Sequence, residues 1–430
     1  MKKYIGVILL VWSVFLHKTN GQTTLEKCQD LSRKNYPGIQ QSGLIQQLEA
    51  YDISNVKKGY LPQFSLSARA TYQTDVTKIP KVFGDLVSAL PGLEGAIPDI
   101  PKDQYQITAE VNQMIWDGGI TQSRQNSIRA SAEVDRQQTE VELYQIKDRV
   151  NQLFFGILII DEYLAMNELL QKELQTNFDR IQISINNGVA NKSDADILLV
   201  ELVKALQKKD DLKATQNGYK EMLAAMTGDN SVLTDTLVIP YFAPLMPVAV
   251  NDNRPEWKLF DAQSSYIQTQ EKLIRQANLP KFLFFGQGGY GNPGLDMFKS
   301  GFTPFFIGGL KFVWNFGGYY TQENQLNQLA VNKQKVEVMK ESFTYNNRLK
   351  VIQLNNEKNR ILGLIQHDDA IIAMRKRIKE SAIIKVEHGT MSTTDLVSEI
   401  NAENAAILDK SLHRIQLLQT ICNIKNINNN

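Results

Sequence analysis

The stretch MIWDGG at Met114–Gly119 closes an alternating, strand-like segment and opens a very long segment with helical periodicity. About 200 positions later, VWNFGG at Val313–Gly318 makes the same transition. A repeat of this length is too long for a solenoid unit and predicts a duplicated half-domain. Two further landmarks recur at a similar spacing, Leu61-Pro62 as Leu279-Pro280 and Asn186-Asn187-Gly188 as Glu387-His388-Gly389. We therefore expect two repeats, residues 22–240 and 241–430, each ordered helix, strand, loop, strand, long helix, tip turn, helix.

The N-terminal residues have the pattern of a signal peptide. Lys2 and Lys3 precede the apolar run Ile5–Leu16, which is too short to span a bilayer comfortably. Thr19 and Gly21 place small residues before a cleavage point, so we interpret residues 1–21 as a signal peptide. A retained membrane anchor is the alternative interpretation of the same segment.

The composition excludes several classes of protein. With 47 basic and 46 acidic residues interspersed, the net charge of +1 predicts no nucleic-acid partner. Beyond the signal, no stretch approaches the roughly 18 apolar residues of a membrane helix. The two cysteines cannot form a disulfide framework and lack metal-site spacing. Cys28 does not indicate a lipoprotein, because Glu26 and Lys27 stand where a lipid-attachment signal needs small residues.

Four segments alternate with period two, at about residues 61–75, 104–116, 279–290 and 302–315. In the first two an apolar face opposes a fully polar one, whereas the second two are rich in aromatic residues. A soluble sandwich would expose the polar face to solvent, while an outer-membrane barrel turns it to a water-filled lumen and the apolar face to lipid. The signal peptide favours the barrel. The apolar positions of the first pair are Phe64, Leu66, Ala68, Ala70, Tyr72, Tyr105, Ile107, Ala109 and Val111.

Four strands are too few to close a barrel. An open sheet edge is not stable in lipid, so strands that enter a membrane require the chain to oligomerise. Three copies would supply twelve strands. The proline-rich segment 76–104 predicts a long exposed loop with one helical turn around Gly84–Leu90.

Two very long helices are predicted at Ile120–Ile185 and Tyr319–Val386, because both segments lack proline and their apolar residues recur every three or four positions. At about 1.5 Å per residue each is on the order of 100 Å long. Gly188 and Gly389 supply the left-handed residue that ends a helix. Shorter antiparallel partners are expected at residues 192–226 and 391–425.

Taken in order, these features resemble the TolC-type outer-membrane efflux proteins over residues 25–425. The matching features are the Leu-Pro entries to the strands, the WDGG and WNFGG exits, the segment GTMSTTDLV at residues 389–397, and Asn35-Tyr36-Pro37 in the first helix. No one of these motifs is specific alone, and their joint order carries the resemblance.

The resemblance implies a mixed α/β membrane protein that forms a homotrimer. A twelve-stranded β-barrel would cross the outer membrane in contact with its lipid, continuous with a periplasmic α-helical barrel. The function implied is the exit duct of a tripartite efflux or type I secretion system. Such a duct passively conducts substrates received from a periplasmic adaptor and an inner-membrane transporter, and needs no cofactor.

The resemblance also assigns roles to individual residues. The tip turns that touch the adaptor would be Asn187, Gly188, Val189, His388, Gly389 and Thr390. The first member of the family's pore-narrowing aspartate pair falls on Asp395. The second falls on Ser398, followed by Glu399, and the family's gate arginine falls on Met391. In a trimer, three copies of such a carboxylate would form an acidic ring around the pore, and Asp194 is a further candidate for this ring. The simplest interpretation of Asp194 is a helix N-terminal carboxylate.

Cys28 opens the first helix and Cys422 lies on the apolar seam of the last one. In the implied topology both chain ends lie in the periplasmic body, where an oxidising compartment permits a disulfide between them. Two separate buried thiols are the alternative.

Two other classes of function compete. An enzyme is disfavoured because His367-Asp368-Asp369 lies within a helix, where adjacent side chains point apart, and because Gly286–Gly291 precedes no helix that could bind phosphate. A secreted or periplasmic coiled-coil structural protein would explain the helices and the signal. It would not explain the alternating strands.

Overall fold

The computed structural model describes residues 21–78, 80–91, 100–242, 253–297, 299 and 301–428. Apart from Gly21, the predicted signal peptide lies outside the described residues. The chain forms two compact units, each of which takes segments from both predicted repeats. Unit 1 comprises Met1–Ile39, Thr139–Pro255 and Phe343–Asn430, and unit 2 comprises Gln40–Gln138 and Glu256–Ser342.

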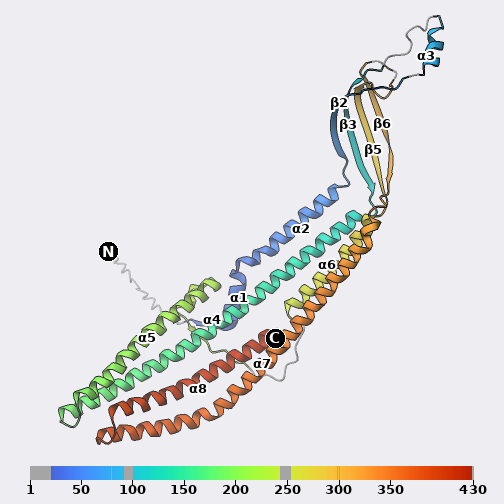
Figure 1. The fold of residues 1–430 in the computed structure, drawn as a ribbon. Helices are drawn as coiled ribbons and strands as arrows, with labels where there is room; N and C mark the ends of the chain where they lie inside the picture. Colours follow the sequence, from blue (N-terminus) through green and yellow to red (C-terminus); the bar gives the residue numbers. More distant parts are fainter. Residues whose placement is uncertain are drawn as a thin grey trace, which may run out of the picture. The chain divides into compact units, whose positions relative to one another are not determined.

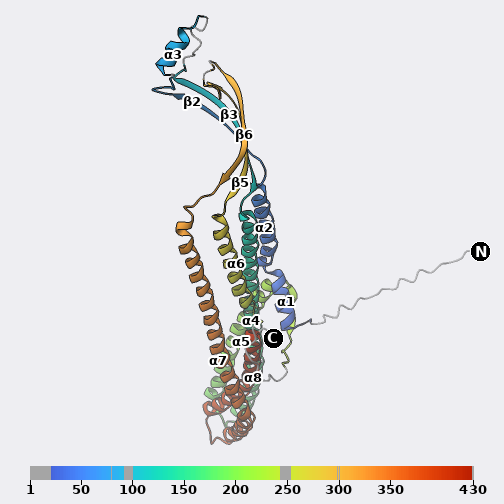
Figure 2. The same ribbon diagram turned by 90° about the vertical axis from the view of Figure 1, so that its right-hand side faces the viewer.

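Unit 2 contains a four-stranded antiparallel sheet (Figures 1 and 2). Its strands are β2 (Gln63–Tyr72), β3 (Asp103–Trp116), β5 (Lys281–Asn292) and β6 (Thr303–Val313), in the order β2-β3-β5-β6. The register pairs Phe64 with Val111 and Val111 with Gly286, so residues of one parity share a face across the sheet. The four strands expected from the alternation are confirmed.

The helices of unit 2 are α2 (Gln41–Lys58), α3 (Lys81–Ser88), α6 (Pro255–Ala277) and the first parts of α4 (Ile120–Asn186) and α7 (Tyr319–Glu387). Arg136 of α4 pairs with Glu49 of α2 at 2.9 Å. Gln270 of α6 donates to Ser127 of α4 at 2.6 Å. The loop helix α3 begins three residues before the single turn predicted around Gly84–Leu90 and is longer than one turn, with Pro80 at its N-cap.

Unit 1 is built from helices and a short parallel ladder. Its helices are α1 (Leu25–Asn35), the remainder of α4, α5 (Lys192–Thr227), the remainder of α7, and α8 (Thr393–Asn428), with 3-10 helices η1 (Pro37–Gln40) and η2 (Asn230–Leu233). The two-residue strands β1 (Gln22–Thr23) and β4 (Thr236–Leu237) pair in parallel. Figure 1 shows α5 running back along α4, and α8 along α7, so each pair is a helical hairpin.

The apolar seam predicted along α4 is buried at most of its positions, including Val150, Ile157 and Leu174. Phe154 lies in the main core of unit 1, which draws residues from α1, α4, α5 and α8. Gly156 lets α5 approach closely, since a side chain there would meet the ring of Tyr219 at 2.7 Å. Across the described residues, no helix combines the length and the apolar composition needed to cross a membrane.

Candidate functional site

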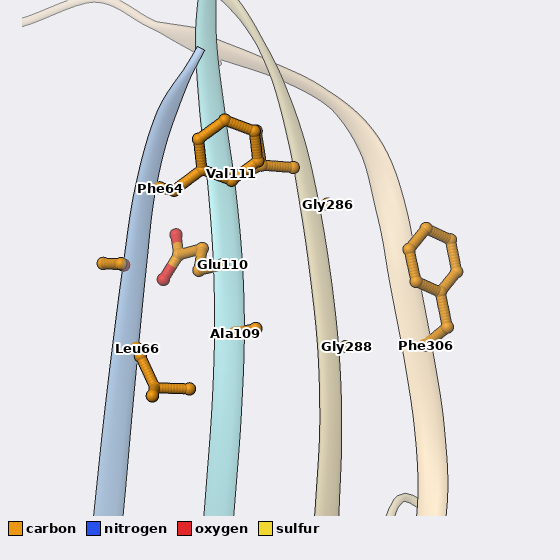
Figure 3. Close-up of a pocket in the computed structure, with 9 residues that line it drawn as sticks. Phe64, Leu66, Ala109, Glu110, Val111, Gly286, Gly288 and Phe306 are labelled. Carbon is orange, nitrogen blue, oxygen red and sulfur yellow. The ribbon is translucent and has the colours of Figure 1, made fainter.

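One face of the sheet is apolar and exposed. Phe64 and Leu66 of β2 are 81 and 76 % exposed, and Phe306 of β6 is 72 % exposed. Between them Gly286 and Gly288 of β5 leave a shallow groove of about 450 Å³ (Figure 3). Such side chains would be buried in a soluble sandwich. Their exposure in a single chain indicates that this face contacts something outside the chain.

The opposite face is polar on β2 and β3, whereas on β5 and β6 it also carries apolar side chains such as Phe285, Phe305 and Ile307. Ser67 and Thr108 lie 3.0 Å apart across β2 and β3, and Asn112 donates to Glu110 at 2.7 Å. The glycine-rich segment Gly286–Gly291 lies inside β5 and pairs with both neighbouring strands, so it is not a phosphate-binding loop.

Aromatic side chains gather at both ends of the sheet. At one end Phe302 lies near Tyr290 and Tyr105, with ring centroids 5.5 and 6.5 Å away. At the other end, neighbouring ring centroids of Trp116, Phe282, Phe312, Trp314 and Phe316 are 4.7 to 6.4 Å apart. Between the two clusters the exposed face is aliphatic or aromatic, which is the arrangement of membrane-interface girdles around an apolar band.

The junction between β3 and α4 is fixed by Asp117, which is 2 % exposed. Its carboxylate accepts hydrogen bonds from the Tyr60 hydroxyl at 2.7 Å and from the backbone N–H groups of Gly119 and Thr121 at 2.9 and 2.8 Å. Burial opposes ionisation of this carboxyl group, but the three hydrogen bonds outweigh it and lower its pKa. The WDGG motif is thus a helix cap as well as a strand end.

The two predicted tip turns have the same backbone geometry. Gly188 and Gly389 have φ values of 76° and 68°, which confirms the left-handed residue expected after each long helix. In each turn the next residue donates back across the last helical turn, Val189 to Ser184 and Thr390 to Lys385, both at 2.9 Å. These bonds define a Schellman motif at each end. All six residues proposed to contact an adaptor are exposed, Asn187, Gly188, Val189, His388, Gly389 and Thr390.

The three candidate ring carboxylates differ in their partners. Asp194 accepts from the backbone N–H of Asn191 and from the Thr393 hydroxyl, each at 3.0 Å. Glu399 lies 3.3 Å from the Arg375 guanidinium. Asp395 is exposed and accepts from its local cap Ser392 at 2.6 Å, and in the described part of the chain it has no ion pair. Of the three carboxylates, Asp395 is therefore the one held only by its local helix cap.

A further charged group, which the sequence did not reveal, joins three helices of unit 1. The Lys379 ammonium of α7 forms ion pairs with Glu173 of α4 and Glu403 of α8, and Asn404 donates to Glu173 at 3.3 Å. We call these four residues the Lys379 centre. Its three charged side chains are 16, 18 and 7 % exposed for Lys379, Glu173 and Glu403. Burial disfavours the ammonium, yet the two carboxylates raise the pKa of Lys379.

Cys28 and Cys422 are both buried in the main core of unit 1, and both are free thiols in the structure. Burial raises the pKa of Cys28 to about 11 and that of Cys422 to about 12. The thiolate is the reactive form, so these thiols would oxidise slowly without a catalyst.

The disulfide stays a prediction that thiol labelling decides. If the bridge forms, denatured and unreduced protein will contain no reactive thiol, and a reducing agent will release two per chain. Two reactive thiols before reduction would mean that Cys28 and Cys422 remain separate buried thiols.

The histidine-aspartate segment is engaged in pairs between α7 and α8. Asp368 lies 2.9 Å from His413, and Asp369 pairs with Lys410. Among the described residues there is no group of three or more His, Cys, Asp or Glu side chains that could hold a metal ion.

Comparison with known structures identifies the fold. The outer membrane protein VceC of Vibrio cholerae superposes with a TM-score of 0.67 at 12% identity, over 94% of this chain and 95% of that one. The CmeC outer membrane channel of Campylobacter jejuni gives 0.66 at 14% identity, over 94% and 85%. The MtrE outer membrane channel of Neisseria gonorrhoeae gives 0.64 at 12% identity, over 94% and 88%.

The chain therefore has the fold of TolC-type outer-membrane efflux channels, as its sequence predicted. No protein-family model matches the sequence, and no curated protein matches it.

Proposed function

We propose that the chain is an outer-membrane channel that works as a homotrimer. It would be the exit duct of a tripartite efflux or type I secretion system, receiving substrates from a periplasmic adaptor and an inner-membrane transporter. One observation carries the proposal. A sheet with an exposed apolar face, whose opposite face is polar on β2 and β3, leads into helices of 67 and 69 residues, the first of them through the Asp117 cap.

The sheet supports the membrane-spanning role. Its apolar face and the aromatic clusters at its two ends match the lipid-facing band of a barrel, and the polar face suits a water-filled lumen. Within the part of the chain that the structure describes, β2 and β6 each pair on one side only. Because an open edge is unstable in lipid, β6 of one copy would pair with β2 of the next.

The helical hairpins support the periplasmic role. Their turns expose Val189 and the matching Thr390 at the end of long paired helices, where an adaptor could bind. The signal peptide at residues 1–21 and the duplication of residues 22–240 as 241–430 remain part of the proposal, since both accord with an exported chain whose halves supply equivalent hairpins.

The trimer is the first test. Native mass measurement or crosslinking of detergent-extracted protein should give three times the mass of one chain, because four strands per copy cannot close a barrel alone. The protein should fractionate with the outer membrane and show heat-modifiable migration. A stable soluble monomer would contradict the proposal and favour the secreted or periplasmic coiled-coil structural protein.

The acidic ring is the second test. Three copies of Asp395 around a narrow lumen should attract multivalent cations, so we expect divalent or trivalent cations to block single-channel conductance in planar bilayers. Asp395→Ala should relieve the block, whereas Asp196→Ala, which removes an exposed carboxylate next to the other tip turn, should not. Unchanged block in the Asp395 variant would place the constriction elsewhere, with Glu399 the next candidate.

A further inference from the structure

The charged side chains of the sheet lie almost entirely on the face opposite the exposed apolar one. Because side chains alternate along a strand, the register of the four strands fixes which residues share this face. Within these strands its one carboxylate is Glu110, to which Asn112 donates. Its basic side chains are Arg69 of β2, Lys281 of β5 and Lys311 of β6. Three basic groups and one acidic group give this face a net charge of +2 in each chain.

Two of the basic side chains lie together at the end of the sheet that adjoins the helices. Lys281 is the first residue of β5, and Lys311 lies two residues before the end of β6. Lys281 pairs with Val313 and Lys311 with Leu283, so the two lysines occupy successive positions of the same face on adjacent strands. Lys311 is exposed and Lys281 half-buried, and in the described part of the chain neither lysine has a carboxylate within ion-pair distance. Their charge is therefore available to an anion.

An apolar patch follows directly along the same face. Phe285, Ile307 and Phe305 occupy its next three cross-strand pairs on β5 and β6, and we call these three residues the inner patch. A side chain added at Gly309 would meet the Phe285 ring at 3.3 Å, and one added at Gly289 would collide with the Phe305 ring, so each ring lies across a glycine of the neighbouring strand. Ile307, between the rings, is 37 % exposed. Contact with lipid does not explain the inner patch, because lipid would meet the other face of the sheet.

We propose that the barrel lumen favours anions that carry an aromatic body, and that Lys281 and Lys311 select these anions by charge. The inference rests on the proposed function, because three copies of this face enclose a lumen only in the trimer. With two lysines from each chain, six would surround the entrance from the helical side, and the inner patch would lie directly beyond them. Basic side chains arranged in a ring give a pore a preference for anions. Aromatic rings of a ligand gain buried apolar area and ring contacts on the inner patch.

Reversal potentials in planar bilayers test the role of charge. The Asp395→Ala channel is the starting point, because it lacks the acidic ring proposed at the tip. Under a potassium chloride gradient it should prefer chloride to potassium by roughly twofold or more. Lys281→Gln/Lys311→Gln in this background should abolish the preference, whereas the charge-conserving pair Lys281→Arg/Lys311→Arg should retain it. A preference for potassium before the lysines are changed, or a chloride preference that survives the glutamine pair, would overturn the inference.

Naphthalene-2-sulfonate, an anion with two fused rings, tests the inner patch in the same background. It should reduce single-channel conductance at concentrations at which methanesulfonate, which lacks rings, and naphthylmethylammonium, which has the opposite charge, do not. Phe305→Thr should weaken this block about threefold or more. Phe306→Thr is the matched control, because it removes the next ring of the same strand from the opposite, lipid-facing side, and it should leave the block unchanged.

Ile307→Thr provides a milder change within the inner patch, because both rings stay in place and threonine suits a strand. It should also weaken the block, so the question is decided even where Phe305→Thr fails to assemble. Equal block by the two naphthalene compounds would contradict selection by charge. Equal effects of the Phe305 and Phe306 variants, or an Ile307 variant that is blocked like the unmodified wall, would contradict binding at the inner patch.

Failure of the inference is distinguishable from failure of the proposed function. A protein that forms no channel in bilayers contradicts the proposed function, and the inference falls with it. A protein that conducts, yet shows no chloride preference in the Asp395→Ala background, contradicts the inference alone.

Discussion

Replacing Phe154 with alanine is expected to lower the free energy of unfolding by about 3–5 kcal/mol. The Phe154 side chain is fully buried, and its ring lies edge-on to Phe155 with centroids 6.2 Å apart. It belongs to the core cluster that draws residues from α1, α4, α5 and α8, and a close-packed core of this kind cannot collapse fully into the cavity left behind. Urea denaturation of the detergent-extracted protein, followed by far-ultraviolet circular dichroism, measures the loss.

Phe83→Ala is the matched control, because it removes the same ring from a side chain of α3 that is 63 % exposed. That change should fall within about 0.5 kcal/mol of the unmodified protein. If Phe154→Ala is as mild as Phe83→Ala, the four helices do not form a common core around Phe154.

The sequence predicts the long helices closely because their limits are set locally. A segment without proline that ends at Gly188 or Gly389 contains both its periodicity and its stop signal, and the helices end at Asn186 and Glu387. The strands are equally local, since alternation fixes which side chains share a face. The fold could therefore be predicted from order and periodicity, with the resemblance to a known family supporting the same conclusion.

The charged contacts could not be predicted in the same way. Glu173, Lys379 and Glu403 are far apart in the sequence. From the sequence alone, each is expected to be a solvent-exposed charged residue on a helix. The N-terminal position of Asp194 was predictable from sequence, whereas its partner Thr393 lies 199 residues away. Such pairs depend on how the two hairpins pack, and helical periodicity gives the face of a residue but not its neighbour on another helix.

The junction of β3 and α4 combines a local signal with a distant partner. Asp117 of the WDGG motif caps α4, as expected for an acidic residue at the start of a helix. The Tyr60 hydroxyl, which also donates to this carboxylate, comes from beyond the end of α2. At the matching place in the second repeat Asn315 is exposed, so this position of the repeated motif is buried in the first half and exposed in the second.

Asp117→Asn should therefore destabilise the protein by about 1–3 kcal/mol near neutral pH. An asparagine keeps one acceptor oxygen and turns an N–H group toward one of the present donors, which leaves a buried backbone N–H without a partner. Asn315→Asp makes the reverse substitution at the exposed equivalent position, where we expect a change within about 0.5 kcal/mol. Equal effects at the two positions would contradict the capping role of Asp117.

The same variant should alter the pH dependence of stability. Because the folded protein lowers the pKa of Asp117 below its ordinary value of 3.8, the unfolded chain takes up this proton first as the solution is acidified. The contribution of the carboxylate is therefore complete above that ordinary value and is lost as pH falls through the lower, folded-state pKa. Denaturation curves of the unmodified protein and Asp117→Asn should be furthest apart near neutral pH and converge below about pH 4. A gap that stays constant into acid would mean that the ionised carboxylate does not hold this junction.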